Sequence, residues 1–497
     1  LKLIWDRTTP FHGSPEIMSD PSSRLTQADS TFSYGSAGSA KDANDIAISN
    51  RGKGEWDTAA WTTVLLLVFL EGAGTALSDL VLPDMAVVNY AGSDVCAGGT
   101  SAACDSAITA VTEAGVLTGM VASIVAIMCA PLAGKLSDLF GNRPIIIVAI
   151  AVSVVVAGVI WAIFTFQWPF YWFYMVSVLP AFIPTDVLIN ILVMHMTTEQ
   201  TRAVAYGLLA AVGTLKSFCA PLLLEFMATS SDESALTQKS LNLMVATRLA
   251  ALVIAFVCLK EATKGANRLS HAQVEKASTW ACLQSLARHP VSTAVLWITM
   301  LGALTGAGEA DIMSQYTKSR FAVTAPTRAG LRLCAAFAGI FANTALLHVL
   351  RNRVGIKMQV AVLGVMGMFV HVMYMIAKSS AGLYPAAAIG ALTSLTGTYV
   401  STLAANVAAD SGMPAGTVMG LYSAVASIGS LVGPPLFSAV FLVSLKPIFW
   451  GQPFPQLALW MGLVLSSVSL ALLLRTPEAA FAGKTATLER EGLEEEA

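Results

Sequence analysis

Apolar residues gather into twelve long runs that are separated by shorter polar stretches. A membrane-spanning helix needs about 20 predominantly apolar residues, because each residue advances about 1.5 Å across about 30 Å of hydrocarbon. Backbone groups must be paired inside lipid, so each run is expected to be helical. The sequence therefore predicts an all-α membrane protein with twelve transmembrane helices. The runs lie near residues 58–82, 112–134, 144–166, 170–194, 204–228, 241–259, 291–312, 327–350, 358–377, 382–406, 415–443 and 456–474.

Composition supports a bilayer as the natural solvent of the chain. Hydrophobic residues make up 55% of the 497 residues and charged residues 12%, against about 25% charged residues in soluble domains. The mean hydropathy is +0.67. The formal net charge of −2 gives no electrostatic basis for binding nucleic acid. We therefore expect the lipid bilayer, and no nucleic acid, as a partner.

The polar stretches divide the chain into two sets of six runs. We expect a disordered cytoplasmic tail at 1–56, a six-helix bundle at 57–259, a cytoplasmic central loop at 260–290, a second bundle at 291–475 and an acidic cytoplasmic tail at 476–497. With the N-terminus inside, the cytoplasmic loops hold eleven basic residues and the opposite loops six. The positive-inside rule then places both termini in the cytoplasm, in a membrane that the sequence does not identify.

A weak internal repeat relates the two bundles. Tyr206-Gly207-Leu208 in the fifth run recurs as Met419-Gly420-Leu421 in the eleventh, at an offset of 213 residues. A second match, between the loop at 138–143 and residues 352–357, lies at an offset of 214. Two matches at nearly one offset indicate a duplicated six-helix unit, a feature of secondary transporters that bind a solute between two halves.

Ionisable residues within the first bundle are candidates for binding a solute or a coupling proton. A charge at mid-membrane costs about 2.5–3.5 kcal/mol on insertion scales, so it should face the bundle interior and have a partner. Glu71 lies midway along the first run, beside glycines that allow close helix contact. Asp186 follows two prolines in the fourth run, and Lys216 lies in the middle of the fifth. We expect Lys216 to pair with Asp186 or Glu71, either as a switch or as a structural lock.

The second bundle offers a similar set. Glu309 ends a glycine-rich stretch of the seventh run, and Arg332 in the eighth run is its expected counter-charge. His371 in the ninth run could titrate near neutral pH, although a lone histidine on a helix is more often a satisfied polar contact.

The loop after the second run carries a recognisable motif. Its residues read Gly134-Lys135-Leu136-Ser137-Asp138-Leu139-Phe140-Gly141-Asn142-Arg143-Pro144. A carboxylate at Asp138 can accept amide hydrogens from a helix N-terminus, Arg143 can fix the loop, and Gly141 suits a turn at positive φ. The simpler interpretation is an ordinary cytoplasmic turn.

Together with the six-plus-six division, Gly134, Asp138, Gly141 and Arg143 resemble the loop motif of the major facilitator superfamily. Within it, the chain is most similar to the hippocampus abundant transcript-like branch, near the tetracycline-resistance transporters. The residues that carry this second likeness are Phe69-Leu70-Glu71, Ala130-Pro131-Leu132, Glu199, Arg202, Ala205-Tyr206-Gly207-Leu208, Glu309-Ala310 and Gly433-Pro434-Pro435-Leu436-Phe437.

The resemblance implies a secondary transporter that moves a small organic solute by alternating access, with protons as a candidate coupling ion. It also implies that the loop motif locks one half against the other until access changes. We expect a monomer without cofactors. The alternative is a solute receptor or trafficking adaptor that has a transporter fold but produces no flux.

Other motifs add packing and exclude some chemistry. Gly429, Gly433 and Pro434 form a small-residue face in the eleventh run that should pack tightly against a neighbouring helix. Cys96 and Cys104 share one non-cytoplasmic loop and are either a disulfide or two free thiols. The sequence has no metal-binding cysteine pattern, P-loop or hydrolase motif, so we expect neither a metal site nor an enzyme.

Overall fold

The computed structural model describes residues 58–91, 102–169, 171–227, 233–260, 279–321, 325–351, 354–411, 413–444, 454 and 456–477. All of these lie in one compact unit, Trp56–Ala497. The tail at 1–56 and the acidic tail at 478–497, which the sequence predicts to be disordered, lie outside the described residues, as does most of the central loop.

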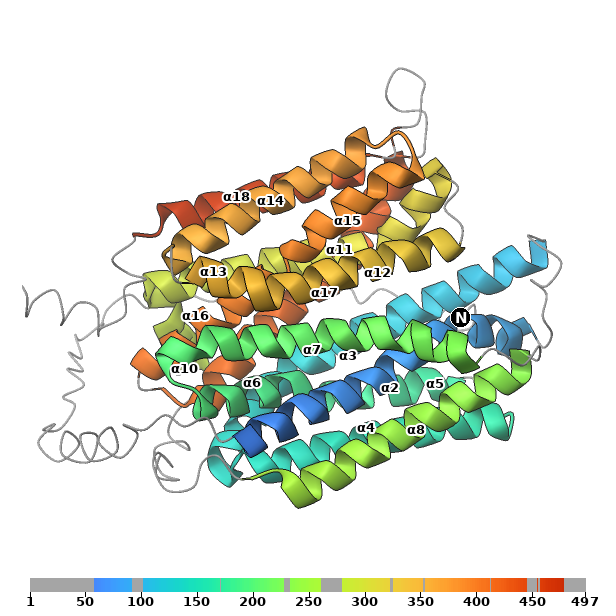
Figure 1. The fold of residues 1–497 in the computed structure, drawn as a ribbon, viewed down its shortest axis with the longest axis horizontal. Helices are drawn as coiled ribbons and strands as arrows, with labels where there is room; N and C mark the ends of the chain where they lie inside the picture. Colours follow the sequence, from blue (N-terminus) through green and yellow to red (C-terminus); the bar gives the residue numbers. More distant parts are fainter. Residues whose placement is uncertain are drawn as a thin grey trace, which may run out of the picture. The chain divides into compact units, whose positions relative to one another are not determined.

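Six of the expected runs form the first group of helices, which lies in the lower part of Figure 1 and is called the N-half below. Its apolar sequences favour helix because a backbone in lipid must pair its own amides and carbonyls. Its elements are α2 (Thr58–Ala91), α3 (Ala102–Phe140), α4 (Asn142–Thr165), α5 (Tyr171–Ser177), η1 (Leu179–Phe182), α6 (Thr185–Met196), α7 (Glu199–Met227) and α8 (Glu233–Cys258).

The short helix α10 (Thr279–Arg288) leads into the second group, the C-half, which lies in the upper part of Figure 1. Its elements are α11 (Pro290–Phe321), α12 (Ala325–Phe341), the π-helical η2 (Ala342–Leu346), α13 (Leu347–Arg351), α14 (Ile356–Ile376), η3 (Ser380–Gly382), α15 (Leu383–Leu392), α16 (Leu395–Ser411), α17 (Ala415–Ser444) and α18 (Leu457–Arg475).

Ten segments of the described chain are long and apolar enough to span a membrane. The other two expected runs are helical as well. Helix α7 carries the charged Arg202 and Lys216, and the run at 382–406 is divided into α15 and α16 by a turn at Thr393–Ser394. The all-helical fold is thus confirmed, whereas the number of twelve spanning helices stays a prediction.

The run that contains Asp186 is broken into three pieces, α5, η1 and α6. Pro180 lies in the first turn of η1, and Pro184 precedes α6. A proline lacks the backbone N–H that a helix interior requires and disfavours helical geometry in the preceding residue. The two prolines therefore interrupt this segment halfway across its expected span.

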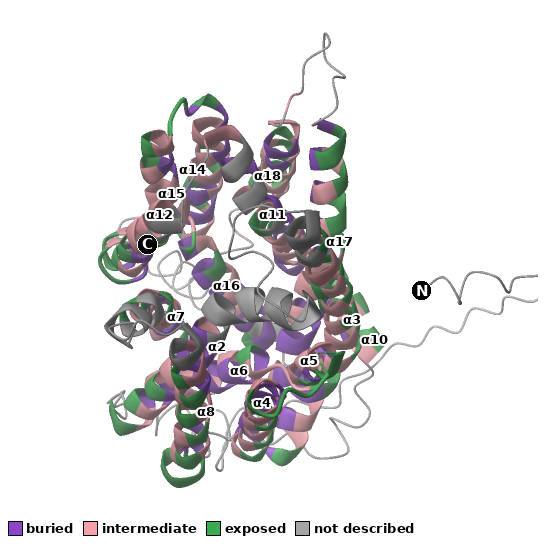
Figure 2. Cartoon of the chain, turned by 90° about the vertical axis from the view of Figure 1, so that its right-hand side faces the viewer, coloured by how far each residue is buried: buried purple, intermediate pink, exposed green. Residues whose placement is uncertain are grey.

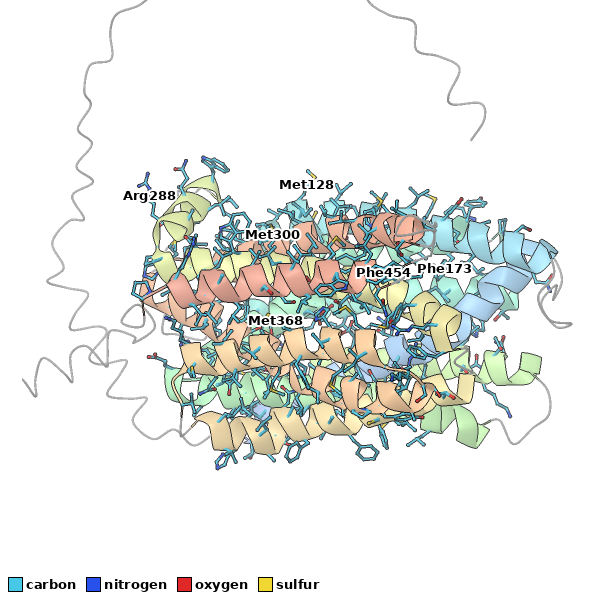
Figure 3. All side chains as sticks on the ribbon, turned by 90° about the horizontal axis from the view of Figure 1, so that it is seen from above. Met128, Phe173, Arg288, Met300, Met368 and Phe454 are labelled. Atoms are coloured by element: carbon cyan, nitrogen blue, oxygen red, sulfur yellow. The ribbon has the colours of Figure 1, made fainter. Side chains whose placement is uncertain are left out.

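Large apolar side chains cover the outside of the helices. Figure 2 shows exposed residues along the outward sides of α4, α8 and α17. Met128 on α3 is 72% exposed and projects outward in Figure 3. Val257 on α8 is 76% exposed. Such a surface suits contact with lipid chains better than contact with water.

The buried apolar residues show where the two halves meet. Among the described residues, one cluster contains side chains from both halves, including Ala130 and Tyr206 from the N-half and Leu403 and Val418 from the C-half. The other clusters each draw on one half alone. The shared cluster lies where α3 ends and α17 begins, which we call the Asp138 end.

Candidate functional site

Glu71 lies near the middle of α2, where three helices of the N-half meet. Its Oε1 atom is 3.7 Å from Nη1 of Arg248 on α8. The hydroxyl of Ser153 on α4 donates a hydrogen bond to the same oxygen at 3.2 Å. The carboxylate is therefore held by a cation and a hydroxyl in a mostly buried position, with its side chain 22% exposed.

Arg248 is the partner that the sequence analysis missed. Its Nη2 atom donates to the hydroxyl of Thr75 at 2.7 Å, one turn along α2 from Glu71. A Cβ at Gly74 would lie 3.2 Å from Nε of Arg248, so the glycine gives the guanidinium room beside the α2 backbone. Arg248 stands within the apolar run at 241–259, and the criterion that selected Lys216 would also have selected it.

Lys216 approaches the same stretch of α2 from α7. A Cβ at Gly72 would overlap its side chain and lie 2.7 Å from Nζ, so Gly72 leaves the space that the ammonium fills. Both Lys216 and Asp186 act electrostatically on Glu71. The expected close ion pair of Lys216 with Glu71 or Asp186 is not formed, and Arg248 takes that place beside Glu71.

Asp186 lies in the first turn of α6, directly after the break at Pro184. A negative charge there is stabilised by the positive end of the helix dipole. The side chain is exposed. Glu71, Arg248, Lys216 and Asp186 thus form a four-residue group that we call the N-half cluster. It joins a partly buried ion pair to an exposed acid.

The corresponding acid of the C-half, Glu309 on α11, has a different partner from the expected one. Nε2 of His371 on α14 is hydrogen-bonded to Oε1 of Glu309, and Nδ1 of the same ring is 2.7 Å from the carbonyl oxygen of Gly367. His371 is 6% exposed. Arg332 on α12 is exposed and is not paired with Glu309, so the expected counter-charge is corrected to His371.

A cavity of about 270 Å³ lies beside this pair within the C-half. Residues of α11, α14, α15–α16 and α18 line it, and Glu309 and His371 are the ionisable members of its lining. Glycine positions create much of the space, because a Cβ at Gly302, Gly306 or Gly367 would meet no atom within 4 Å. The remaining walls are formed by aliphatic side chains and by the hydroxyls of threonine and serine.

Asp138, near the end of α3, binds the first residues of α17. Its Oδ1 accepts from the backbone N–H of Gly416 at 2.8 Å, and its Oδ2 accepts from the N–H and hydroxyl of Thr417 at 2.9 and 3.2 Å. The first amides of a helix have no partner within the helix, so a carboxylate there satisfies them and stabilises the dipole. The loop motif of one half therefore caps a helix of the other.

The rest of the motif shapes the loop. Gly141 has a φ of 93°, which only glycine adopts readily, and it joins α3 to α4. Arg143 donates to the carbonyl oxygen of Phe256 at the end of α8, at 2.8 Å. Ser137 donates to the side-chain oxygen of Asn142 across the turn. These contacts fix the loop, and the loop in turn positions Asp138 at the first residues of α17.

Glycines bring α3 and α17 into backbone contact next to this cap. A Cβ at Gly134 would overlap the carbonyl oxygen of Gly416, and a Cβ at Gly420 would lie 2.7 Å from Cα of Pro131. Any larger side chain would separate the two helices. Contact between the halves at this end consequently depends on glycine.

A second contact between the halves joins α7 to α12 and η2. A Cβ at Gly207 would lie 2.9 Å from the carbonyl oxygen of Asn343. The buried Arg202 donates to the side-chain oxygen of Asn406 on α16 at the same end. Gly207 and Gly420 are the glycines that the sequence repeat places at equivalent positions, and each lies against the opposite half.

The small-residue face of α17 lies against α11. A Cβ at Gly429 would lie 2.8 Å from the backbone nitrogen of Leu304, and one at Gly433 would lie 3.1 Å from that of Gly308. Pro434 continues the face inside the unbroken helix. The candidate disulfide between Cys96 and Cys104 concerns side chains outside those that the structure describes.

Replacing Asp138 with Asn should weaken the contact between the halves. The amide keeps one acceptor oxygen but loses the charge and the second acceptor, so we expect a cost of about 1–2 kcal/mol. The measurement is the midpoint of thermal unfolding in detergent. Glu113→Gln also replaces an acid with its amide, at an exposed site on the same helix, and should leave the midpoint unchanged. Equal shifts in the two variants would contradict the capping role.

Comparison with known proteins agrees with this geometry. The sequence profile of the Major Facilitator Superfamily matches residues 64–434. The chain is 23% identical over 334 residues to the hippocampus abundant transcript 1 protein of Homo sapiens. This alignment covers 65% of the chain and 64% of the relative, so the match spans less than two thirds of the relative's length.

Solved structures show the same fold. The human organic anion transporter MFSD10 (TETRAN) is 16% identical, with a TM-score of 0.66 over 84% of this chain and 99% of its own. The superfamily transporter FucP, in the outward conformation, is 16% identical, with a TM-score of 0.62 over 84% of this chain and 98% of its own. These observations confirm the resemblance to the hippocampus abundant transcript branch, and the chain is a multi-pass membrane protein that belongs to the Major Facilitator Superfamily.

Proposed function

We propose that this chain is a secondary active transporter that moves a small organic solute across a membrane by alternating access. The observation that carries the proposal is the set of polar, apolar and glycine contacts that join the halves at the Asp138 end. The shared apolar cluster, the Asp138 cap and the glycine contacts of α3 with α17 all lie at the Asp138 end. By the distribution of basic residues, this end would face the cytoplasm.

Contacts of this kind can be broken without unfolding either half. Asp138 binds α17 through hydrogen bonds, and water can replace these when the halves separate. The glycine contacts bury little side-chain surface. Each half also has apolar clusters of its own, which remain packed when the halves separate. A rocking motion about the middle would then expose the N-half cluster to the other side of the membrane.

The N-half cluster supplies the chemistry expected of a solute site. Two cations and two acids lie within one half, and Asp186 is accessible at the broken helix α6. Charged groups in a low-dielectric site orient polar groups of a ligand strongly, so sugars and organic anions are the first solutes to test. The names of the structural neighbours include an organic anion transporter and a proton:xylose symporter, which supports the same choice.

The test begins with the purified chain and a panel of sugars, organic acids and organic cations. A solute present at 100 times its dissociation constant should stabilise the fold by about 2.7 kcal/mol, which thermal unfolding would detect. The stabilising solute is then measured for counterflow in liposomes that contain the chain. Counterflow supports a carrier, whereas stabilisation without counterflow supports the receptor or adaptor alternative.

A further inference from the structure

We propose that Glu309 and His371 form a proton-binding site in the C-half, and that the bound proton joins α11 to α14. The inference deepens the proposed function, because it names the residue pair that would bind a coupling ion and separates this site from the N-half cluster. It rests on the hydrogen bonds of the imidazole ring and on the position of the cavity.

The two ring nitrogens of His371 have different partners, and these partners fix the protons. A carbonyl oxygen only accepts hydrogen bonds, so the contact of Nδ1 with Gly367 places a hydrogen on Nδ1. In a neutral ring Nε2 then carries a lone pair and no hydrogen. A carboxylate oxygen also carries only lone pairs, so Nε2 and Oε1 of an ionised Glu309 would repel each other.

The observed bond between Nε2 and Oε1 therefore requires a proton between the two atoms. The proton can be assigned to the ring, as an imidazolium beside a carboxylate, or to the acid, as a carboxyl that donates to a neutral ring. In both descriptions the pair holds one proton more than a neutral histidine and an ionised glutamate. Loss of that proton to water removes the bond and leaves two lone pairs facing each other.

The surroundings allow the proton to enter and leave. The side chain of Glu309 is 23% exposed, and both residues line the cavity between α11, α14 and α18. From α15–α16 and α18 the cavity is lined by threonine, serine and leucine, which do not titrate in this range. From α14, the hydroxyl of Tyr374 acts electrostatically with Glu309. Arg320, the cation of α11 whose side chain the structure describes, lies about three turns beyond Glu309 and donates to the hydroxyl of Tyr316.

Gly462 of α18 lies directly against the Glu309–His371 pair. A Cβ at Gly462 would overlap Oε1 of Glu309 and lie 2.7 Å from Nε2 of His371. The backbone of α18 thus confines both atoms and leaves no room for a water molecule between them. A change in the bond between Nε2 and Oε1 is transmitted directly to the packing of three helices.

The experiment is nitrogen-15 NMR of the full chain in lipid vesicles, with labelled histidine and the proton as the probe. His371→Gln identifies the resonances of His371 among the six histidines. Across a pH series in the wild type, we expect Nδ1 to stay protonated while Nε2 changes from a hydrogen-bonded to a bare nitrogen. Glu309→Gln should abolish this change over the same range, because its amide donates to Nε2 without a titrating proton.

Two further variants complete the test. Gly462→Ala keeps both ionisable groups but wedges them apart, so the hydrogen-bonded Nε2 resonance should be lost. His348→Gln, at an exposed position near the end of the C-half, should leave the His371 resonances unchanged. A wild-type His371 with a bare Nδ1, or an identical pH series in Glu309→Gln, would overturn the proposal. The test uses no solute, so either of these results leaves the transport proposal standing.

Discussion

Replacing Arg248 with Gln should be among the most destabilising single changes in the N-half. The substitution leaves the Glu71 carboxyl group near mid-membrane with Ser153 and the more distant Lys216 as its remaining polar partners. Removing one partner of a buried ion pair costs about 3–5 kcal/mol. Both side chains are partly exposed here, at 12% and 22%, and screening reduces the expected cost to about 2–3 kcal/mol. The measurement is chemical unfolding of the wild type and the variant in the same detergent.

The double variant Glu71→Gln/Arg248→Gln tests the physical cause. It removes both charges and leaves two amides that can bond to each other and to Thr75. We expect it to recover most of the stability that either single variant loses, since residues in one ion pair are not additive. Lys239→Gln, a change of the same kind at an exposed site of α8, should alter stability by no more than about 0.5 kcal/mol. Additive losses in the double variant would show that the two residues act separately.

We expect the double variant to regain stability without regaining solute binding or counterflow. If the N-half cluster binds the solute, the double variant folds but no longer gains stability from that solute or produces counterflow. If the pair is only a structural lock, stability and counterflow return together. This comparison decides between the two roles that the sequence leaves open for these charges.

Gly134→Ala should open the contact between the halves at the Asp138 end. The added Cβ would overlap the carbonyl oxygen of Gly416, and a backbone atom cannot move aside as a flexible side chain can. Overpacking of this kind costs about 1–3 kcal/mol. A cost of about 2 kcal/mol changes the ratio of closed to open forms roughly 30-fold, since about 1.4 kcal/mol corresponds to a factor of ten.

Spin labels on the two halves measure this opening. Phe140 ends α3 and Ala409 lies near the end of α16, and both side chains are exposed at the Asp138 end. We expect the distance distribution between labels at these positions to shift to longer values in Gly134→Ala. Gly119→Ala is the matched control on the same helix, because a Cβ there meets nothing within 4 Å. A shift in the control, or none in Gly134→Ala, would contradict the role assigned to Gly134.

The helical architecture follows from hydropathy. Lipid leaves a backbone no choice but internal pairing, so each long apolar run had to become helix wherever its neighbours lie. Pro180 and Pro184 lie at the break before α6, and Gly207 and Gly420, which the repeat places at equivalent positions, each lie against the opposite half. Where a turn divides a run, as between α15 and α16, hydropathy alone does not establish the number of spans.

The pairing of the charged groups depends on how the helices pack. Glu71 was selected from its position in an apolar run, but its partner Arg248 lies 177 residues away on another helix. Glu309 likewise pairs with His371 rather than with Arg332. The Asp138 carboxylate reaches the amides of Gly416 and Thr417 on a helix of the opposite half. Hydropathy predicts which residues lie in the membrane. The rotation and packing of each helix determine the direction in which each of these side chains points.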